Sequence, residues 1–283
     1  MSAAEAAQLA ALADFAARHA IVLLLALATL LLLSVWIAWH LLERHGPRLL
    51  APLARTWPFS GGRGQLPGRF GLLLLLGFAV TVTAAMSFFE LAGEIGAGDE
   101  LAAFDLALAA ALARHLDPAT LALASAVTRF GDPAVLWPLG LAVTIGLAWR
   151  GERWQTAGWI AATGGGPLLN FLLKQLFERS RPLHPHGFAQ ADGFSFPSGH
   201  ASGSLLVYGM LTYLVVRHTS PRWHPPVAAI ALLLIVLVGA SRVLLQVHWF
   251  SDVLAGWAFA TAWGALCIAT LEAGRLAATA RID

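Results

Sequence analysis

Residues 20–42 read AIVLLLALATLLLLSVWIAWHLL, a run long enough to cross a lipid bilayer as a single helix. A spanning helix needs about 20 mostly apolar residues, because the hydrocarbon core is about 30 Å thick and an α-helix rises about 1.5 Å per residue. The rest of the chain has the same character: 58% of its 283 residues are hydrophobic, 12% are charged, and the mean hydropathy is +0.70. The sequence therefore predicts an integral membrane protein rather than a soluble domain.

Six further apolar segments follow the first one. They cover residues 70–91, 133–149, 154–177, 201–216, 225–245 and 250–271. We interpret the first segment as a retained anchor rather than a secretory signal, because it is too long and because Glu5 and Asp14 precede it. The predicted fold is an all-α membrane bundle with seven spans.

The distribution of arginine predicts the orientation of this bundle. Five arginines follow the first span, whereas the connection at residues 92–132 is predominantly acidic. Cytoplasmic loops collect positive charge, so we expect the N-terminus outside, the C-terminus in the cytoplasm and residues 92–132 outside. Four cations then fall on the outer side against this rule and need another explanation: Lys174, Arg179, Arg181 and Arg242.

The first of three polar motifs is KQLFERSRP at residues 174–182. Lys174 and Arg181 are seven residues apart, nearly two helical turns, so both can project from one face if the helix persists as far as Pro182. Two cations on one edge can bind one anion. The alternative is an ordinary helix end at which Lys174 pairs with Glu178 at i+4.

The second motif, Pro197-Ser198-Gly199-His200, stands directly before an apolar run. Ser198 is a good N-cap residue, and Gly199 allows a ligand to approach the backbone closely. A helix that begins here directs free N–H groups and the positive end of its dipole at its surroundings, which favours phosphate. The alternative is a capped helix with an exposed histidine.

The third motif, SRVLLQVHWFSD, occupies residues 241–252 and joins the last two spans. On a helix, residues four apart lie one above the other, so Asp252 can accept the Nδ1 proton of His248 and leave Nε2 with its lone pair outward. This arrangement is typical of an activated nucleophile. The alternative is a structural hydrogen bond.

Other charged residues near these motifs receive different interpretations. Arg179 and Asp192 lie between the first two motifs and are candidates for substrate selection or for a solvated loop surface. Asp132 follows Gly131 just before the span at residues 133–149, so we expect it to cap that helix.

Together the three motifs resemble the signature of the type 2 phosphatidic acid phosphatase superfamily. All eleven fixed positions match in order: Lys174, Arg181, Pro182, Pro197, Ser198, Gly199, His200, Ser241, Arg242, His248 and Asp252. The resemblance extends over residues 69–273 and implies a six-helix phosphatase core at residues 69–283. Residues 1–68 are then an additional N-terminal transmembrane helix with a basic cytoplasmic linker.

The resemblance also implies a role for each matching residue. His248 is the nucleophile, Asp252 holds its tautomer, and His200 donates a proton to the leaving oxygen. The phosphoryl oxygens are held by Lys174, Arg181, Ser198, Gly199 and Arg242. No metal and no cofactor is implied.

The position of the motifs at the membrane surface indicates the kind of substrate. A site among helices can receive a phosphorylated headgroup while the hydrocarbon chains stay in the lipid, so we expect a lipid phosphate or diphosphate as substrate. The bilayer is the expected partner and nucleic acid is not. The expected location is a bacterial inner membrane, with the site on the periplasmic face.

Three alternatives to lipid phosphate hydrolysis remain open. They are a lipid phosphotransferase with the same phosphohistidine, a vanadium haloperoxidase, and a lipid-phosphate binder or transporter without enzymatic activity. Seven apolar segments count against the haloperoxidase, because those enzymes are soluble. A binder needs the cations but not a neutral His248 paired with Asp252.

Overall fold

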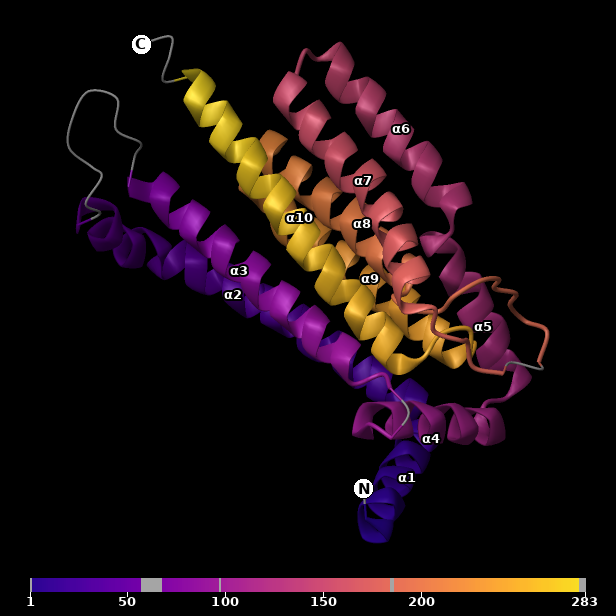
Figure 1. Cartoon of the computed structure of the whole chain (residues 1–283). Helices are drawn as coiled ribbons and strands as arrows, with labels where there is room; N and C mark the ends of the chain where they lie inside the picture. Colours follow the sequence, from indigo (N-terminus) through magenta and orange to yellow (C-terminus); the bar gives the residue numbers. More distant parts are fainter. Residues whose placement is uncertain (1, 57–67, 97, 184–185, 280–283) are drawn as a thin grey trace.

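A computed structural model describes residues 2–56, 68–96, 98–183 and 186–279, and these residues form helices and no strand (Figure 1). The α-helices are α1 (Ala3–Arg18), α2 (Ala20–Thr56), α3 (Gly68–Gly93), α4 (Glu100–His115), α5 (Pro118–Thr128), α6 (Pro133–Trp149), α7 (Arg153–Phe177), α8 (Gly199–His218), α9 (His224–Leu244) and α10 (Phe250–Thr279). Short 3₁₀ turns, η1 (Arg129–Gly131) and η2 (Pro221–Trp223), precede α6 and α9. The predicted all-α class is confirmed.

Six segments within the described residues are long and apolar enough to span a membrane. They cover residues 20–45, 74–93, 118–149, 199–218, 221–244 and 250–275. The predicted span at 154–177 forms α7, which is long enough at 25 residues but is less apolar than the others. Its buried polar side chains, Gln155 and Asn170, face neighbouring helices rather than lipid.

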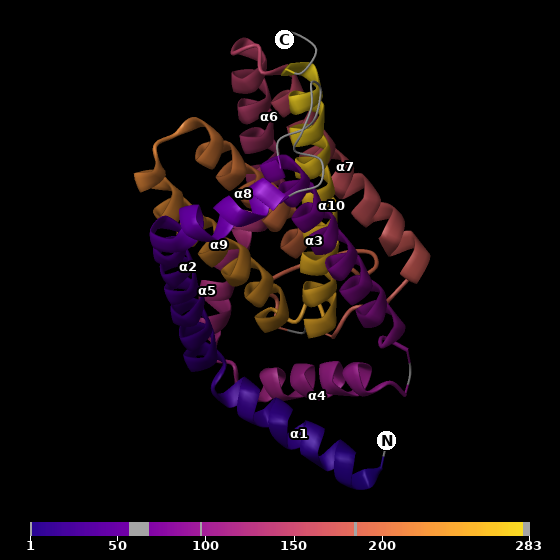
Figure 2. The same cartoon turned by 90° about the vertical axis from the view of Figure 1, so that its left-hand side faces the viewer.

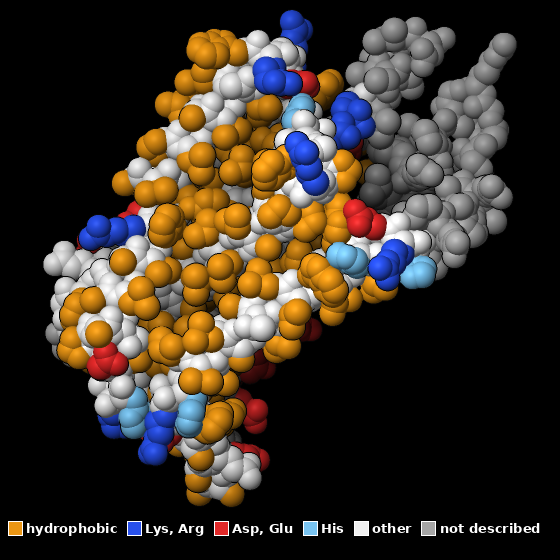
Figure 3. Space-filling view, turned by 180° about the vertical axis from the view of Figure 1, so that it is seen from behind, with side chains coloured by type: hydrophobic (Ala, Val, Ile, Leu, Met, Phe, Trp, Pro, Cys, Tyr) orange, Lys and Arg blue, Asp and Glu red, His pale blue; other side chains and the backbone are white. Residues whose placement is uncertain are grey.

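The helices pack around α8, α9 and α10. α10 packs along α3, α8 and α7, while α9 packs against α8, α2 and α5. The C-terminal end of α10 lies at one end of the bundle, and the α7–α8 loop and the α9–α10 turn lie at the other (Figure 1). Hydrophobic side chains cover the broad face in Figure 3, and charged side chains gather towards its two ends, as expected for a protein surrounded by lipid.

The segment at residues 92–132 contains two helices rather than a loop. α4 lies across the end of the bundle, and α5 leads through η1 into α6, which lengthens the predicted span at 133–149 (Figures 1 and 2). α4 is not among the segments that are apolar enough to span, and its buried face packs on the α9–α10 turn.

The N-terminal helix α1 packs along α4. Asp14 of α1 lies 3.3 Å from Arg114 Nη2 and 2.8 Å from His115 Nε2, and Ala13 is fully buried. The first residues of the chain therefore contact the predicted core directly. Division of the chain at residue 68 stays a prediction, and residues 57–67 of the predicted linker lie outside the described residues.

Candidate active site

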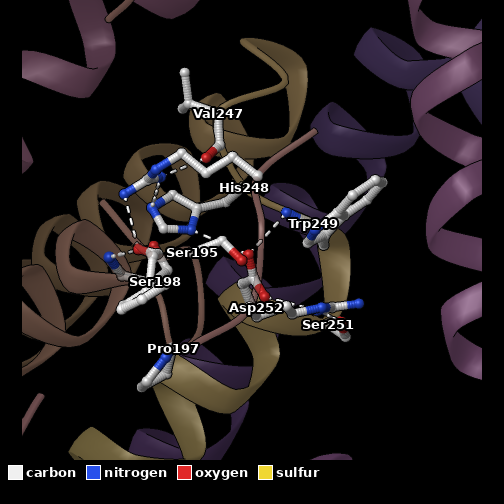
Figure 4. Close-up of polar contacts among 12 residues, drawn as sticks. Ser195, Pro197, Ser198, Val247, His248, Trp249, Ser251 and Asp252 are labelled. Atoms are coloured by element: carbon white, nitrogen blue, oxygen red, sulfur yellow. Dashed lines mark hydrogen bonds and ion pairs between the residues drawn. The ribbon is translucent and has the colours of Figure 1, made fainter. Parts of the chain in front are cut away.

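The three polar motifs meet at the end of the bundle that also holds α4 and the N-terminus. The first motif ends α7, the second begins α8, and the third forms the α9–α10 turn. Figure 4 shows His248 above Asp252, with the Ser195–Ser198 segment alongside. Residues from four helices that are distant in sequence thus line one site.

The cations of the first motif meet in a way that differs from the sequence prediction. α7 ends before Glu178, which has a left-handed conformation (φ 46°), so Arg181 lies in the following loop and not on the helix face of Lys174. Lys174 Nζ donates to the carbonyls of Phe194 (2.7 Å) and Ser195 (3.0 Å), and Arg181 Nη2 donates to the same Phe194 carbonyl (3.0 Å). The alternative of a Lys174–Glu178 pair is not found among the described ion pairs.

The second motif forms the predicted helix start. α8 begins at Gly199, and Ser198 Oγ accepts a hydrogen bond from Ala201 N (3.4 Å), so the N-cap prediction is confirmed. The Ser198 amide donates to the Asp252 carbonyl (2.9 Å). Gly256 makes this approach possible, because a Cβ atom there would stand 2.8 Å from the Ser198 carbonyl oxygen.

The third motif forms the His–Asp pair, although His248 precedes α10 rather than lying on it. His248 Nδ1 is 3.2 Å from Asp252 Oδ2, which also accepts from Trp249 N (3.0 Å). His248 Nε2 is 3.1 Å from Arg181 Nη1. Because a guanidinium can only donate, Nε2 is the acceptor and Nδ1 carries the proton.

The surroundings of His248 keep its ring neutral. Its side chain is 3% exposed, and burial lowers its pKa well below the usual 6.5. The neighbouring positive charges of Arg242, Arg181 and Lys174 lower this pKa further. A neutral imidazole with Nε2 unprotonated has the lone pair that a nucleophile needs.

Three cations of the site have no carboxylate partner among the described ion pairs: Lys174, Arg181 and Arg242. Arg242 is 4% exposed; its Nη1 donates to Thr128 Oγ1 (2.7 Å), and its Nε has no hydrogen-bond partner within the described residues. Removing a charge from water costs several kcal/mol when nothing compensates it. The arrangement therefore favours binding of an anion, which would accept hydrogen bonds from these groups.

Arg179 faces inward and does not line a substrate surface. Its Nη1 lies 2.7 Å from both Asp252 Oδ1 and Ser251 Oγ, and its Nη2 lies 2.9 Å from Asp105 Oδ2. Its side chain is 11% exposed. The interpretation of Arg179 as a substrate-selecting or solvated loop residue is wrong, because it ties α4 to the carboxylate that holds His248.

Asp105 and Asp132 are two carboxylates whose contacts the sequence analysis missed. Buried Asp105 accepts from Arg179, from Ser251 N (3.1 Å) and from Ser251 Oγ; desolvation raises its pKa while these bonds oppose the shift. Asp132 stands at the N-cap of α6 but makes no side-chain cap hydrogen bond. Its Oδ1 lies 2.7 Å from His200 Nε2, so Asp132 takes the predicted N-cap position while its side chain binds His200 and not the helix amides.

Comparison with known proteins identifies the family. A family model described as the PAP2 superfamily matches residues 156–275. The crystal structure of the transmembrane PAP2-type phosphatidylglycerolphosphate phosphatase from Bacillus subtilis matches with a TM-score of 0.63 and 30% identity, over 69% of this chain and 96% of that chain. The chain belongs to the PAP2 superfamily. It is an integral membrane protein, as its apolar helices and this transmembrane relative show.

Two curated PAP2 relatives match over shorter segments. Phosphatidylglycerophosphatase B of Bacillus subtilis is 36% identical over 123 residues, which are 43% of this chain and 60% of that protein. Undecaprenyl-diphosphatase of Sulfolobus acidocaldarius is 42% identical over 64 residues, 23% of this chain and 27% of that protein. The matched part of the chain spans less than two thirds of either relative.

Asp105, Arg179 and Asp132 lie outside the PAP2 signature that the sequence analysis used. Arg179 carried one signal, since it is a cation on the predicted outer side. Asp105 carried none, because it is one of several acidic residues in the segment 92–132, and Asp132 was interpreted only as a helix cap. Asp192 is exposed, and its carbonyl accepts from Arg181 Nη2 (3.1 Å).

Proposed function

We propose that this PAP2 protein hydrolyses a phosphate ester or diphosphate of a membrane lipid through a phosphohistidine on His248. One observation carries the proposal: a buried His248, held by Asp252 at Nδ1, places Nε2 3.1 Å from Arg181 Nη1, and Lys174 and Arg242 add further positive charge nearby. Anion binding alone would need the cations but no oriented, neutral imidazole.

The first chemical step transfers the phosphoryl group to the enzyme. The Nε2 lone pair of His248 attacks phosphorus, the N–P bond forms, and the P–O bond to the lipid breaks. Asp252 keeps the Nδ1 proton in place and stabilises the imidazolium that develops. His200 gives a proton to the departing oxygen, so that the lipid leaves as an alcohol, or as a monophosphate when the substrate is a diphosphate.

The second step returns the enzyme to its starting state. His200, now neutral, takes a proton from water as the water oxygen attacks phosphorus, the N–P bond breaks, and inorganic phosphate leaves. In both steps the phosphoryl oxygens would be held by Lys174, Arg181, Arg242, the Ser198 side chain and the Gly199 amide. Such preorganised donors stabilise the charge that builds up in the transition state.

The lipid class follows from the relatives and from the position of the site. The names of the two curated relatives point to phosphatidylglycerol phosphate and undecaprenyl diphosphate, and phosphatidic acid shares the same reacting group. The site lies at the ends of helices that are apolar enough to span the membrane, so a lipid can present its phosphate while its chains remain in the bilayer. The proposed substrates are therefore lipid phosphates and diphosphates of this kind.

The activity is tested by phosphate release from a panel of these lipids in detergent, with EDTA added. We expect wild type to release phosphate and His248→Asn to release none. His224→Asn is the matched control, because His224 lies at the opposite end of the bundle at the start of α9 and should have wild-type activity. A radiolabelled phosphoenzyme that forms in wild type and not in His248→Asn, in samples quenched without acid, would support the phosphohistidine intermediate.

Other outcomes of the same assay would change the proposal. Phosphate release that appears only when a lipid acceptor is added would indicate a phosphotransferase. Tight binding of the lipids with no release, by folded protein, would favour the binding or transport alternative. Release that survives in His248→Asn would refute the phosphohistidine.

The proposed location is a bacterial inner membrane, with the N-terminus and the site on the periplasmic side and the C-terminus in the cytoplasm. The support is the arginine distribution, because the α6–α7 and α8–α9 connections lie away from the site and carry Arg150, Arg153, Arg217 and Arg222. With Cys267 replaced by serine, a membrane-impermeant maleimide should label Gln8→Cys in intact cells and Ser220→Cys only after permeabilisation. The reverse pattern would refute this orientation.

A further inference from the structure

The segment at residues 128–132, between α5 and α6, contacts the site at several points although it is outside the three motifs. Thr128 Oγ1 accepts from Arg242 Nη1 (2.7 Å), and the Phe130 carbonyl accepts from the Tyr208 hydroxyl (2.6 Å). These two bonds fix the segment to α9 and to α8. The segment is therefore held in place by side chains of the neighbouring helices and forms one side of the site.

The same segment lies against the ring of His200. A Cβ atom on Gly131 would stand 3.1 Å from His200 Cδ2 and 2.5 Å from Val238 Cγ1, so a glycine is needed for the backbone to pass this close. The next residue, Asp132, places Oδ1 2.7 Å from His200 Nε2. The carboxylate thus holds one nitrogen of the ring and leaves Nδ1 available.

The structure assigns Asp132 as the positioning residue for the general acid: it binds the Nε2 proton of His200 and directs the Nδ1 proton at the leaving oxygen. This inference rests on the proposed function, because it gives His200 its proton-donor role. Asp132 itself touches neither the lipid nor the phosphoryl group in this assignment.

The charges around His200 explain why such a carboxylate is needed. Burial of the His200 ring disfavours a positive charge on it, and Arg242 from α9 and Arg181 from the α7–α8 loop oppose that charge further. Asp132 is the carboxylate in direct contact with His200. An opposite charge at hydrogen-bond distance favours the protonated imidazole, which a general acid requires.

The two histidines of the site are each held by a carboxylate, but through different ring nitrogens. Asp252 binds His248 at Nδ1 and leaves Nε2 for attack on phosphorus, whereas Asp132 binds His200 at Nε2 and leaves Nδ1 for proton transfer. The surroundings match the two tasks. His248 is held neutral among cations, while the side chains of His200 and Asp132 remain 20% and 37% exposed.

A kinetic test compares Asp132→Asn with wild type on two substrates. A lipid alkyl phosphate needs a proton on its leaving oxygen, whereas an aryl phosphate has a leaving group that departs without one. We expect kcat on the lipid phosphate to fall about 30- to 100-fold and kcat on the aryl phosphate to fall less than about threefold, because general acid catalysis contributes about 10² or more. The basic limb of the lipid pH profile should also move to lower pH.

The control is Asp99→Asn, an N-cap carboxylate of α4 that bonds the Gly96 amide (2.8 Å). It should leave kcat on both substrates at the wild-type value. Equal losses on the lipid and aryl phosphates in Asp132→Asn would show a merely structural role and overturn the assignment. An unchanged kcat on the lipid phosphate would overturn it as well.

A second measurement does not depend on activity. Nitrogen-15 NMR of histidine-labelled protein, with the His200 signal identified by its loss in His200→Gln, follows ring protonation with and without inorganic phosphate. We expect the titration midpoint of His200 to be lower in Asp132→Asn than in wild type by at least about one pH unit. An identical midpoint overturns the inference. If wild type hydrolyses no lipid, the proposed function fails while this midpoint still decides whether Asp132 controls the proton.

Discussion

Replacing Arg242 by methionine should make the protein more stable and nearly inactive. Arg242 is buried, its Nη1 donates to Thr128, and among the described residues it forms no ion pair with a carboxylate. Methionine fills a similar volume without the charge. Arg179→Met is the matched comparison, because Arg179, whose side chain is 11% exposed, lies beside the same site and binds both Asp105 and Asp252.

The expected changes in stability have opposite signs. Removing a poorly compensated buried charge can stabilise a protein by about 1–4 kcal/mol, and the lost bond to Thr128 costs about 1 kcal/mol. Arg242→Met should therefore gain up to about 3 kcal/mol, which corresponds to a Tm increase of up to about 8 °C. Arg179→Met leaves two buried carboxylates without their cation, so it should lose about 3–5 kcal/mol.

Thermal unfolding in detergent and lipid phosphate hydrolysis measure the two effects on the same preparations. We expect kcat/KM of Arg242→Met to fall by about 10²–10³, the usual effect of deleting one donor to transition-state charge. Saturating inorganic phosphate should raise the Tm of wild type more than that of Arg242→Met, since a ligand stabilises the state that binds it. A lower Tm in Arg242→Met, together with unchanged hydrolysis, would refute the view that this cation is held ready for an anion.

Three other predictions concern the same end of the bundle. Because burial and nearby cations lower the pKa of His248, the acidic limb of kcat/KM should lie below pH 6.5; Arg181→Met removes one of those cations and should move the limb upward, and a limb that does not move would contradict this. Asp105→Asn should lower kcat about tenfold with little change in KM, because Asp105 holds Arg179, which in turn holds Asp252, and neither contact involves the phosphate site. A change in KM alone would indicate another role for Asp105. Gly256→Ala should lower both Tm and kcat, because its Cβ would meet a carbonyl oxygen at 2.8 Å, whereas Gly140→Ala, with open space around it, should change neither.

Local sequence patterns predicted those parts of the fold and site that depend on neighbouring residues. Apolar length predicted six of the seven proposed spans, and Ser198 before Gly199 predicted the start of α8. The His248–Asp252 contact needed only a spacing of four residues, and it forms even though His248 precedes the helix. These features survive small errors in the helix boundaries.

Features set by tertiary packing were not predictable in the same way. Asp105 and Asp132 look like other acidic residues of the segment 92–132 until α4 and η1 are placed against the site. The end of α7 was also missed, because Glu178 takes a left-handed conformation that its residue type rarely adopts. Arg181 consequently reaches Lys174 through the Phe194 carbonyl and not along one helix face.

The backbone contact between the PSGH loop and α10 fixes the width of the reaction space. The Ser198 amide bonds the Asp252 carbonyl, and Gly256 lets the two segments touch, so the separation of His200 and His248 is set by main-chain atoms that a lipid cannot push aside. A fixed distance between the two histidines selects for the phosphoryl group that is transferred and not for the rest of the lipid. Lipids as different as a glycerophospholipid and a polyprenyl diphosphate can then meet the same pair of histidines, and discrimination between them must come from surfaces that contact the leaving group.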